Sequence, residues 1–294
     1  MAPPKIIVAP GAGFCRGVRR AVEQAEELMA DGARLVSLGP LMHCPQEVER
    51  LEGEGLAVVA PAAVGDDDAV LVRTHGATVE QLEHLESRAG GSVHDATCSR
   101  VRACQTIAGR MAAEGYGVVV VGVPGHAELD AVLSHARGRA GEGEQRTGRP
   151  APVLVVSAPD ELDLPALEGV RRVAVLAQTT VTRPRYREVV AAALDRFVEV
   201  RAFDTICDAT GRRQRDAERL AQGVDLVVVV GGRNSANTTR LAETCAAITA
   251  THHVETAEDL EAAWFEGAER VLVTAGASTP GWLIDRVVQR LGKL

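Results

Sequence analysis

Short runs of β-branched residues alternate with amphipathic segments along the whole chain. Val-rich runs that alternate with helices are typical of parallel strands covered on both faces, so the pattern predicts an α/β protein. The predicted strands are 5–10, 34–39, 69–75, 117–123, 153–157, 172–178, 225–231 and 270–276. Helical periodicity is clearest at 19–30, 101–115 and 215–223. The segment 138–152, rich in Gly, Pro and charge, is predicted to be an exposed loop.

Three cysteines mark an internal repeat in this pattern. Each is followed by a helix and lies 24 residues before a glycine at the end of the next strand. The pairs are Cys15 with Gly39, Cys98 with Gly122, and Cys207 with Gly231. We therefore expect three similar α/β units, 14–97, 98–204 and 205–294, with the N-terminal strand 1–13 pairing in the third. Units of this size need one another to complete a core, so the expected architecture is a trefoil.

The same cysteines lie where a metal site is expected. Ligands gather at the carboxyl ends of parallel strands, and a helix N-terminus favours the thiolate that binds metal. Three thiolates suit either a catalytic zinc or a [4Fe–4S] cluster with one open iron. Zinc sites usually include a local C-x-x-C pair, which these three cysteines lack. The alternative is three buried structural thiols, the role that we expect for Cys104 and Cys245, and Cys44 is not expected to be a ligand.

Polar loops follow the predicted strands and open the next helices. Helix N-termini with hydroxyl, amide and imidazole donors bind phosphate or diphosphate without lysine. Capping explains any single Ser, Thr or Asn equally well. The loops carry His43, His75, His126, Glu128, Gln178, Thr179, Thr180, Asn234, Ser235, Asn237 and Ser278. Glu128 is a candidate proton donor, and its alternative role is a first-turn carboxylate that interacts with the helix dipole.

Composition narrows the class of protein. The 294 residues carry a formal net charge of −8 and only 3% aromatic residues, which argues against broad nucleic-acid binding. The only lysines are Lys5 and Lys293. No apolar run is long enough to cross a membrane, and the N-terminal segment does not resemble a secretory leader. We therefore expect a cytoplasmic protein that binds neither membranes nor nucleic acid.

The motifs together resemble one known family. They are G-F-C-R-G-V, D-A-T-C, G-H-A-E, Q-T-T, D-x-I-C-x-A-T, G-x-x-N-S-x-N and T-A-G-A-S-T-P, in this order. They resemble the 4-hydroxy-3-methylbut-2-enyl diphosphate reductase family. The resemblance implies a trefoil around a [4Fe–4S] cluster held by Cys15, Cys98 and Cys207. It also implies reductive removal of an allylic hydroxyl, which yields isopentenyl and dimethylallyl diphosphates, with electrons from a ferredoxin or flavodoxin.

The resemblance also implies roles for residues of the polar loops. Glu128 would supply a proton, Thr179 would position the substrate hydroxyl and a water, and His126 would assist catalysis. The implied diphosphate ligands are His43, His75, His126, Thr180, Ser235, Asn237 and Ser278.

Two departures from the family's motifs keep other functions open. Ala236 replaces the second Ser of N-S-S-N, and Cys44 replaces the Asn of His-Asn. Each change removes a polar group beside an expected anion loop. The alternatives are a related iron–sulfur reductase or dehydratase with another substrate, and a non-enzymatic iron–sulfur sensor.

Overall fold

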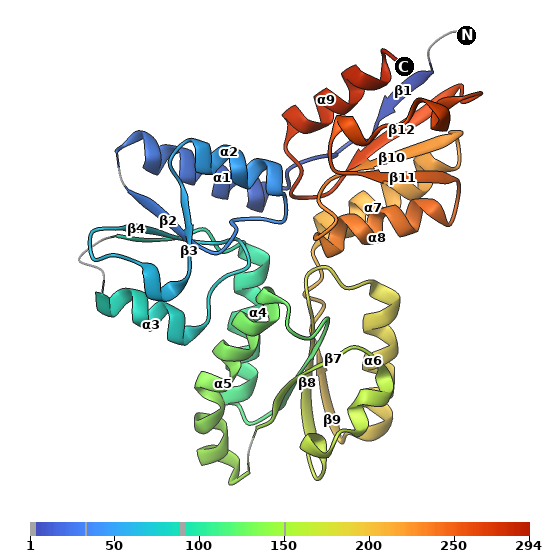
Figure 1. Ribbon diagram of the computed structural model, residues 1–294. Helices are drawn as coiled ribbons and strands as arrows, with labels where there is room; N and C mark the ends of the chain where they lie inside the picture. The colour runs from blue at the N-terminus through green and yellow to red at the C-terminus, as the bar shows by residue number, and fades with distance from the viewer. Residues whose placement is uncertain (1–3, 33, 89–91, 150) are drawn as a thin grey trace. The chain divides into compact units, whose positions relative to one another are not determined.

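The computed structural model describes residues 4–32, 34–88, 92–149 and 151–294, which form three four-stranded sheets and the helices that cover them (Figure 1). The chain divides into two compact units. Compact unit 1 consists of Met1–Gly32, Pro40–Ala57 and Asp208–Leu294. Compact unit 2 consists of Ala33–Gly39 and Val58–Cys207.

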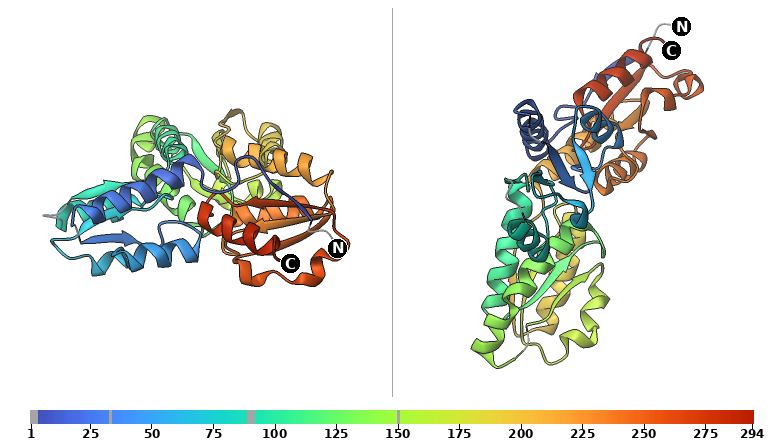
Figure 2. Two further views of the ribbon diagram at one scale, coloured as in Figure 1. Left: turned by 90° about the horizontal axis from the view of Figure 1, so that it is seen from above. Right: turned by 60° about the vertical axis from the view of Figure 1, so that its left-hand side comes forward.

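Compact unit 1 holds one parallel sheet, to which both ends of the chain contribute (Figure 2). Its strand order is β1 (Lys5–Val8), β12 (Arg270–Ala275), β10 (Leu226–Val230) and β11 (Ala250–Val254). Its helices are α1 (Arg16–Ala30), α2 (Pro45–Gly53), α7 (Asp208–Ala221), α8 (Ala236–Ala246) and α9 (Gly281–Leu291). The parallel register of β1 with β12 confirms that the N-terminal strand pairs in the third repeat.

Compact unit 2 holds the other two sheets. The first has the order β3 (Ala57–Val59), β2 (Leu35–Leu38), β4 (Ala69–Val72) and β5 (Val93–Asp95). The second has the order β7 (Val153–Val156), β6 (Gly117–Val121), β8 (Arg172–Ala177) and β9 (Glu199–Ala202). The helices are α3 (Val79–Arg88), α4 (Ser99–Ala113), α5 (Ala127–Thr147) and α6 (Arg183–Arg196).

The continuous Val run of β6 is buried because helices cover both faces of its sheet. Val118 and Val120 pack in one core cluster with residues of α4 and α5. Val119 and Val121 pack in another with residues of α6. Successive side chains of a strand point to opposite faces, so a strand covered on both sides has no polar position. The apolar runs in the sequence therefore predicted these central strands correctly.

The three sheets repeat one hydrogen bond at the equally spaced glycines. In each sheet a central strand ends at a glycine, whose N–H donates to the last carbonyl of the neighbouring edge strand. The bonds join Gly39 to Val59 at 3.2 Å, Gly122 to Val156 at 2.9 Å, and Gly231 to Val254 at 2.9 Å. The fold class, three similar parallel-sheet α/β units, is confirmed. The unit boundaries 14–97, 98–204 and 205–294 stay a prediction.

All eight predicted strands are present, and the four strands that the pattern missed all lie at sheet edges. These are β3, β5, β9 and β11. β9 (EVRA) shows the reason, since three of its four residues are exposed. An edge strand tolerates charged and polar residues, which interrupt the apolar run on which the prediction depended.

The predicted loop at 138–152 is wrong. α5 continues to Thr147, so among the described residues of this range only 148–149 and 151–152 lie outside the helix, and residue 150 lies outside the described residues. Gly143 allows close packing against α4, which runs beside α5 (Figures 1 and 2). A Cβ at Gly143 would lie 2.0 Å from the carbonyl oxygen of Ala112 and 2.9 Å from the Cα of Gly115. Glycine here lets two helices approach, whereas the sequence pattern suggested a flexible segment.

We expect Gly143→Ala to destabilise the protein by about 1–3 kcal/mol, because the added methyl overpacks the α4–α5 contact. The matched control is Gly141→Ala on the same helix, where a Cβ meets nothing within 4 Å. That change should stabilise the helix by about 0.5–1 kcal/mol. Thermal unfolding followed by circular dichroism measures both, and equal melting temperatures for the two variants would refute this explanation of the glycines.

Candidate active site

The three repeated cysteines occupy equivalent positions in the fold. Each follows an edge strand and lies immediately before a helix. Its N–H donates to the carbonyl of the second residue after the end of the neighbouring central strand. The bonds join Cys15 to Ala277 at 3.0 Å, Cys98 to Thr74 at 3.0 Å, and Cys207 to Thr179 at 2.9 Å. The repeat found in the sequence is therefore also a repeat of backbone contacts at the carboxyl edges of the sheets.

The surroundings of these cysteines suit thiolate ligands. All three are partly exposed, and the side chains of Cys15 and Cys98 do not cap the helices that they precede. A thiol at a helix N-terminus is favoured as thiolate, the form that iron and zinc bind. Cys15 belongs to compact unit 1, and Cys98 and Cys207 belong to compact unit 2. Within the described ranges, no three His, Cys, Asp or Glu residues form a group that could hold a metal ion, and the shared ligand role stays a prediction.

The other three cysteines are buried and unsuited to metal binding. Burial raises the pKa of Cys104 to about 12 and the pKa values of Cys44 and Cys245 to about 11. These thiols stay protonated at neutral pH. The expected core role of Cys104 and Cys245 is confirmed by their complete burial.

A buried polar contact in compact unit 2 joins Glu128 to Thr179. Glu128 follows the N-cap of α5, and its side chain is buried, with 2% of the residue exposed. One carboxylate oxygen accepts the Thr179 N–H at 2.7 Å, and the other accepts the Thr179 hydroxyl at 2.7 Å. The carbonyl of Thr179 in turn accepts the N–H of Cys207. A buried carboxyl group is thus held one residue away from a candidate metal ligand.

Burial raises the pKa of Glu128, and the two hydrogen bonds from Thr179 oppose this by stabilising the carboxylate. A raised pKa increases the fraction of the protonated acid near neutral pH. This is the property that a proton donor requires.

Two histidines continue the polar contacts toward Cys98. His126 caps α5, and its Nδ1 accepts the N–H of Glu128 at 3.1 Å. The rings of His126 and His75 meet edge to face, with centroids 5.7 Å apart. His75 follows Thr74, whose carbonyl accepts the N–H of Cys98. Burial lowers the pKa of His126, which favours the neutral imidazole.

A glutamine beside this site has an unused donor. Gln178 is fully buried, and its Oε1 accepts the N–H of Val123 at 3.0 Å. Its Nε2 has no hydrogen-bond partner among the described residues. A buried, unpaired amide is costly, so it points to a group that binds there. Thr180, two residues further, is partly exposed at the same loop.

Compact unit 1 holds a second set of expected binding residues. Ser235 caps α8, where its hydroxyl accepts the N–H of Thr238 at 3.3 Å. Asn237 in the first turn is 9% exposed, and its Nδ2 has no partner among the described residues. The loop of His43 reaches the same place, since a Cβ at Gly232 would lie 3.0 Å from the His43 carbonyl oxygen.

The loop before α9 completes this set. Thr279 donates its hydroxyl to the carbonyl of Val230, at the end of β10, over 3.0 Å. Ser278 beside it is partly exposed. Compact unit 1 therefore places four of the expected residues in the loops and first helical turn at the carboxyl edge of one sheet: His43, Ser235, Asn237 and Ser278. Compact unit 2 brings together four others: His75, His126, Glu128 and Thr179. Sequence reasoning missed Glu47 and Trp282, which connect two of the loops in compact unit 1, because both resemble ordinary first-turn helix residues.

The fold and these sites define an α/β protein with a buried acid beside candidate metal ligands. The sequence profile of the LytB protein family matches residues 6–292. The 4-hydroxy-3-methylbut-2-enyl diphosphate reductase of Geobacter sulfurreducens is 43% identical over 98% of this chain and 96% of its own. The Geobacter metallireducens protein of that name is 42% identical over 99% of this chain and 98% of its own.

Solved structures agree with these relatives. The structure of (E)-4-hydroxy-3-methyl-but-2-enyl diphosphate reductase, the terminal enzyme of the non-mevalonate pathway, has a TM-score of 0.75 and 37% identity, covering 99% of this chain and 100% of that chain. The Plasmodium falciparum E-1-hydroxy-2-methyl-but-2-enyl-4-diphosphate reductase has a TM-score of 0.84 over 98% of this chain and 87% of that chain; at 22% identity it supports the fold alone.

The chain therefore belongs to the LytB protein family, and the resemblance seen in the motifs is confirmed. Its curated relatives are reductases, so the expectation of an oxidoreductase is also confirmed. Among the helices of the described residues, none has the length and apolar character needed to cross a membrane.

We expect Thr179→Val to raise the pKa of Glu128 further, because the variant loses the hydroxyl that stabilises the carboxylate. A hydrogen bond to a charged group contributes roughly 1.5–3 kcal/mol, which corresponds to about one to two pKa units. A carbon-13 NMR titration of the Glu128 carboxyl group measures the shift. Thr180→Val is the control, and an unchanged pKa in Thr179→Val would contradict the assigned contact.

Proposed function

We propose that the chain is a [4Fe–4S]-dependent reductase that converts (E)-4-hydroxy-3-methylbut-2-enyl diphosphate to isopentenyl and dimethylallyl diphosphates. The observation that carries the proposal is the buried Glu128–Thr179 contact, one backbone hydrogen bond away from Cys207. The near full-length identity to reductases of this substrate supports it.

Cys15, Cys98 and Cys207 are the proposed ligands of the cluster. They fit the group because each cysteine is partly exposed immediately before a helix, and cysteine sulfur atoms are the usual ligands of iron–sulfur clusters. Three protein ligands for a four-iron cluster leave one iron open. When bound, such a cluster supplies Lewis acidity toward the substrate hydroxyl and a route for two electrons.

The diphosphate is proposed to bind hydroxyl, amide and imidazole donors of the polar loops. Asn237 and Ser235 lie at the N-terminus of α8, whose backbone dipole favours an anion. The unpaired Nδ2 of Asn237 gains a partner when the anion binds. In compact unit 2, His126 at the N-terminus of α5 is a proposed ligand of the diphosphate. The other proposed ligands are His43, His75, Thr180 and Ser278.

Glu128 is proposed to hold and deliver a proton. The overall reaction consumes two electrons and two protons, breaks the allylic C–O bond, forms a C–H bond and releases water. Burial raises the pKa of Glu128, which favours the protonated acid that a proton donor requires. Thr179 fixes the orientation of this acid through two contacts and is proposed to position the substrate hydroxyl.

The proposed electron donor is a cytoplasmic ferredoxin or flavodoxin. Of the two departures from the family's motifs, Cys44 is 1% exposed at the N-cap position of α2, so its thiol belongs to the protein interior. Ala236 is exposed in the first turn of α8, where the missing hydroxyl removes one donor from the proposed diphosphate site. The remaining donors of this loop, Ser235 and Asn237, are both present.

We expect Glu128→Gln to lower turnover by roughly 10²–10⁴-fold, because the amide cannot supply the proton. The assay is anaerobic, uses reduced methyl viologen and hydroxymethylbutenyl diphosphate, and includes an iron count on the same preparation. The iron content should equal that of the wild type. Glu144→Gln, an exposed change on the same helix, is the control and should retain full activity.

A fully active Glu128→Gln variant would remove the proton-donor role. A wild-type chain that carries iron but does not turn over this substrate would instead refute the proposed function and favour a related enzyme with another substrate.

A further inference from the structure

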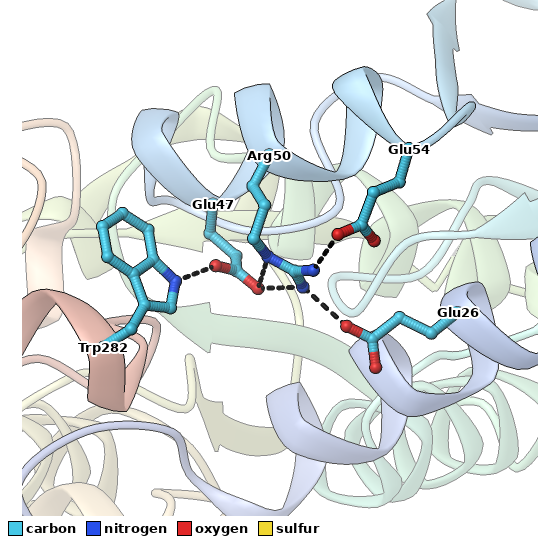
Figure 3. A network of polar contacts seen from close by, with 5 residues as sticks. All are labelled: Glu26, Glu47, Arg50, Glu54 and Trp282. Atoms are coloured by element: carbon cyan, nitrogen blue, oxygen red, sulfur yellow. Dashed lines mark hydrogen bonds and ion pairs between the residues drawn. The ribbon is translucent and has the colours of Figure 1, made fainter.

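Glu47 is a glutamate whose carboxylate is buried in the first turn of a helix. It lies in the first turn of α2, three residues after Cys44, and is 1% exposed. Burial of a charged group is unfavourable unless partners satisfy it. Glu47 has two such partners, and one of them comes from a distant part of the sequence (Figure 3).

Trp282 is the distant partner. Its indole Nε1–H donates to one carboxylate oxygen of Glu47 at 2.7 Å. Trp282 is the second residue of α9, four residues after Ser278, and Glu47 is four residues after His43. A single hydrogen bond therefore joins the first turns of the two helices whose preceding loops carry these proposed diphosphate ligands.

Arg50 fixes the other carboxylate oxygen and extends the contact to a third helix. It donates to Glu47 at 2.6 Å and 3.1 Å, to Glu54 at 2.7 Å, and to Glu26 of α1 at 2.7 Å (Figure 3). Its hydrogen bond to Glu47 is the main cause of the raised pKa of Arg50. α1 begins directly after Cys15, so the network links the helices behind three segments of the proposed site.

On its other side, the His43 loop packs against the loop of α8. The space beside Gly232 is filled by the His43 carbonyl and the ring of Pro45, the first residue of α2. The loop is thus held by packing on one side and by the Glu47–Trp282 hydrogen bond on the other. Donors fixed before the ligand arrives bind it with less loss of conformational freedom.

We propose that Glu47 and Trp282 are positioning residues that set the spacing of the His43 and Ser278 loops and thereby the affinity for a diphosphate. The inference rests on the proposed function, because it assigns the ligand of those loops. Neither residue touches the substrate in this proposal. Their effect should therefore appear in binding and leave the rate of the bound complex nearly unchanged.

The test compares Trp282→Phe with Glu47→Gln. Trp282→Phe keeps an aromatic ring and loses the N–H donor, so we expect the Kd for inorganic pyrophosphate and the KM for the substrate to rise roughly tenfold, with kcat within about twofold. Glu47→Gln keeps an oxygen acceptor for the indole and loses the charge that pairs with Arg50, so we expect a smaller rise. Calorimetry on the anaerobic holoenzyme gives the Kd, and viologen-driven turnover gives KM and kcat.

Trp264→Phe is the matched control. Trp264 is the other tryptophan of the chain, lies in the same compact unit and stacks on His252 at 3.9 Å. We expect its Kd and KM to equal those of the wild type. A Trp282→Phe variant that melts earlier and binds pyrophosphate as tightly as the wild type would show a purely structural role and overturn the inference, as would equal losses in both tryptophan variants. A wild-type chain that does not bind pyrophosphate would overturn the proposed diphosphate site as well.

Discussion

The backbone hydrogen bond that joins each repeated cysteine to the loop of the neighbouring central strand is the constraint on which the site depends. It occurs at Cys15, Cys98 and Cys207 with lengths between 2.9 and 3.0 Å. The bond fixes where the edge strand ends and the following helix starts, so each thiol is presented at a helix N-terminus. The carbonyl groups that accept these bonds belong to Thr74, Thr179 and Ala277. Thr179 is itself a candidate site residue, and the other two directly precede His75 and Ser278. One repeated backbone contact thus couples the fold to the proposed chemistry.

The two compact units contribute different chemistry. Compact unit 2 contains the acid, Glu128, whose pKa is raised by burial, and the hydrogen bonds from Thr179 fix its orientation and favour the carboxylate. Compact unit 1 contains hydroxyl and amide donors at the N-terminus of α8 and a network of charged residues behind the neighbouring loops. A reductase that removes a hydroxyl from a diphosphate ester needs both functions, a proton source and an anion site. In the proposed function, Glu128 supplies the proton and hydroxyl, amide and imidazole groups form the anion site, in a chain with only two lysines.

The sequence predicted the repeated units and the apolar central strands correctly. It did not predict the features that depend on tertiary contacts. The equal spacing from Cys98 to Gly122 and its counterparts identified the three repeated units. The apolar runs identified their central strands, because a strand covered on both faces must be apolar. β9 was missed because an edge strand carries charged residues. The segment 138–147 was assigned to a loop because the sequence does not indicate that Gly143 packs against another helix. The Glu47–Trp282 contact joins residues 235 positions apart, which no local pattern indicates.

The most direct test of the account is the iron and inorganic sulfide content of anaerobically purified cysteine variants. Cys15→Ser, Cys98→Ser and Cys207→Ser should each lose most of the roughly four irons per chain that a [4Fe–4S] protein carries. Cys245→Ala, which changes a buried thiol of the core, should keep them. Wild-type iron content in any one of the three serine variants would contradict the assignment of that cysteine as a ligand, and with it the shared role of the repeat.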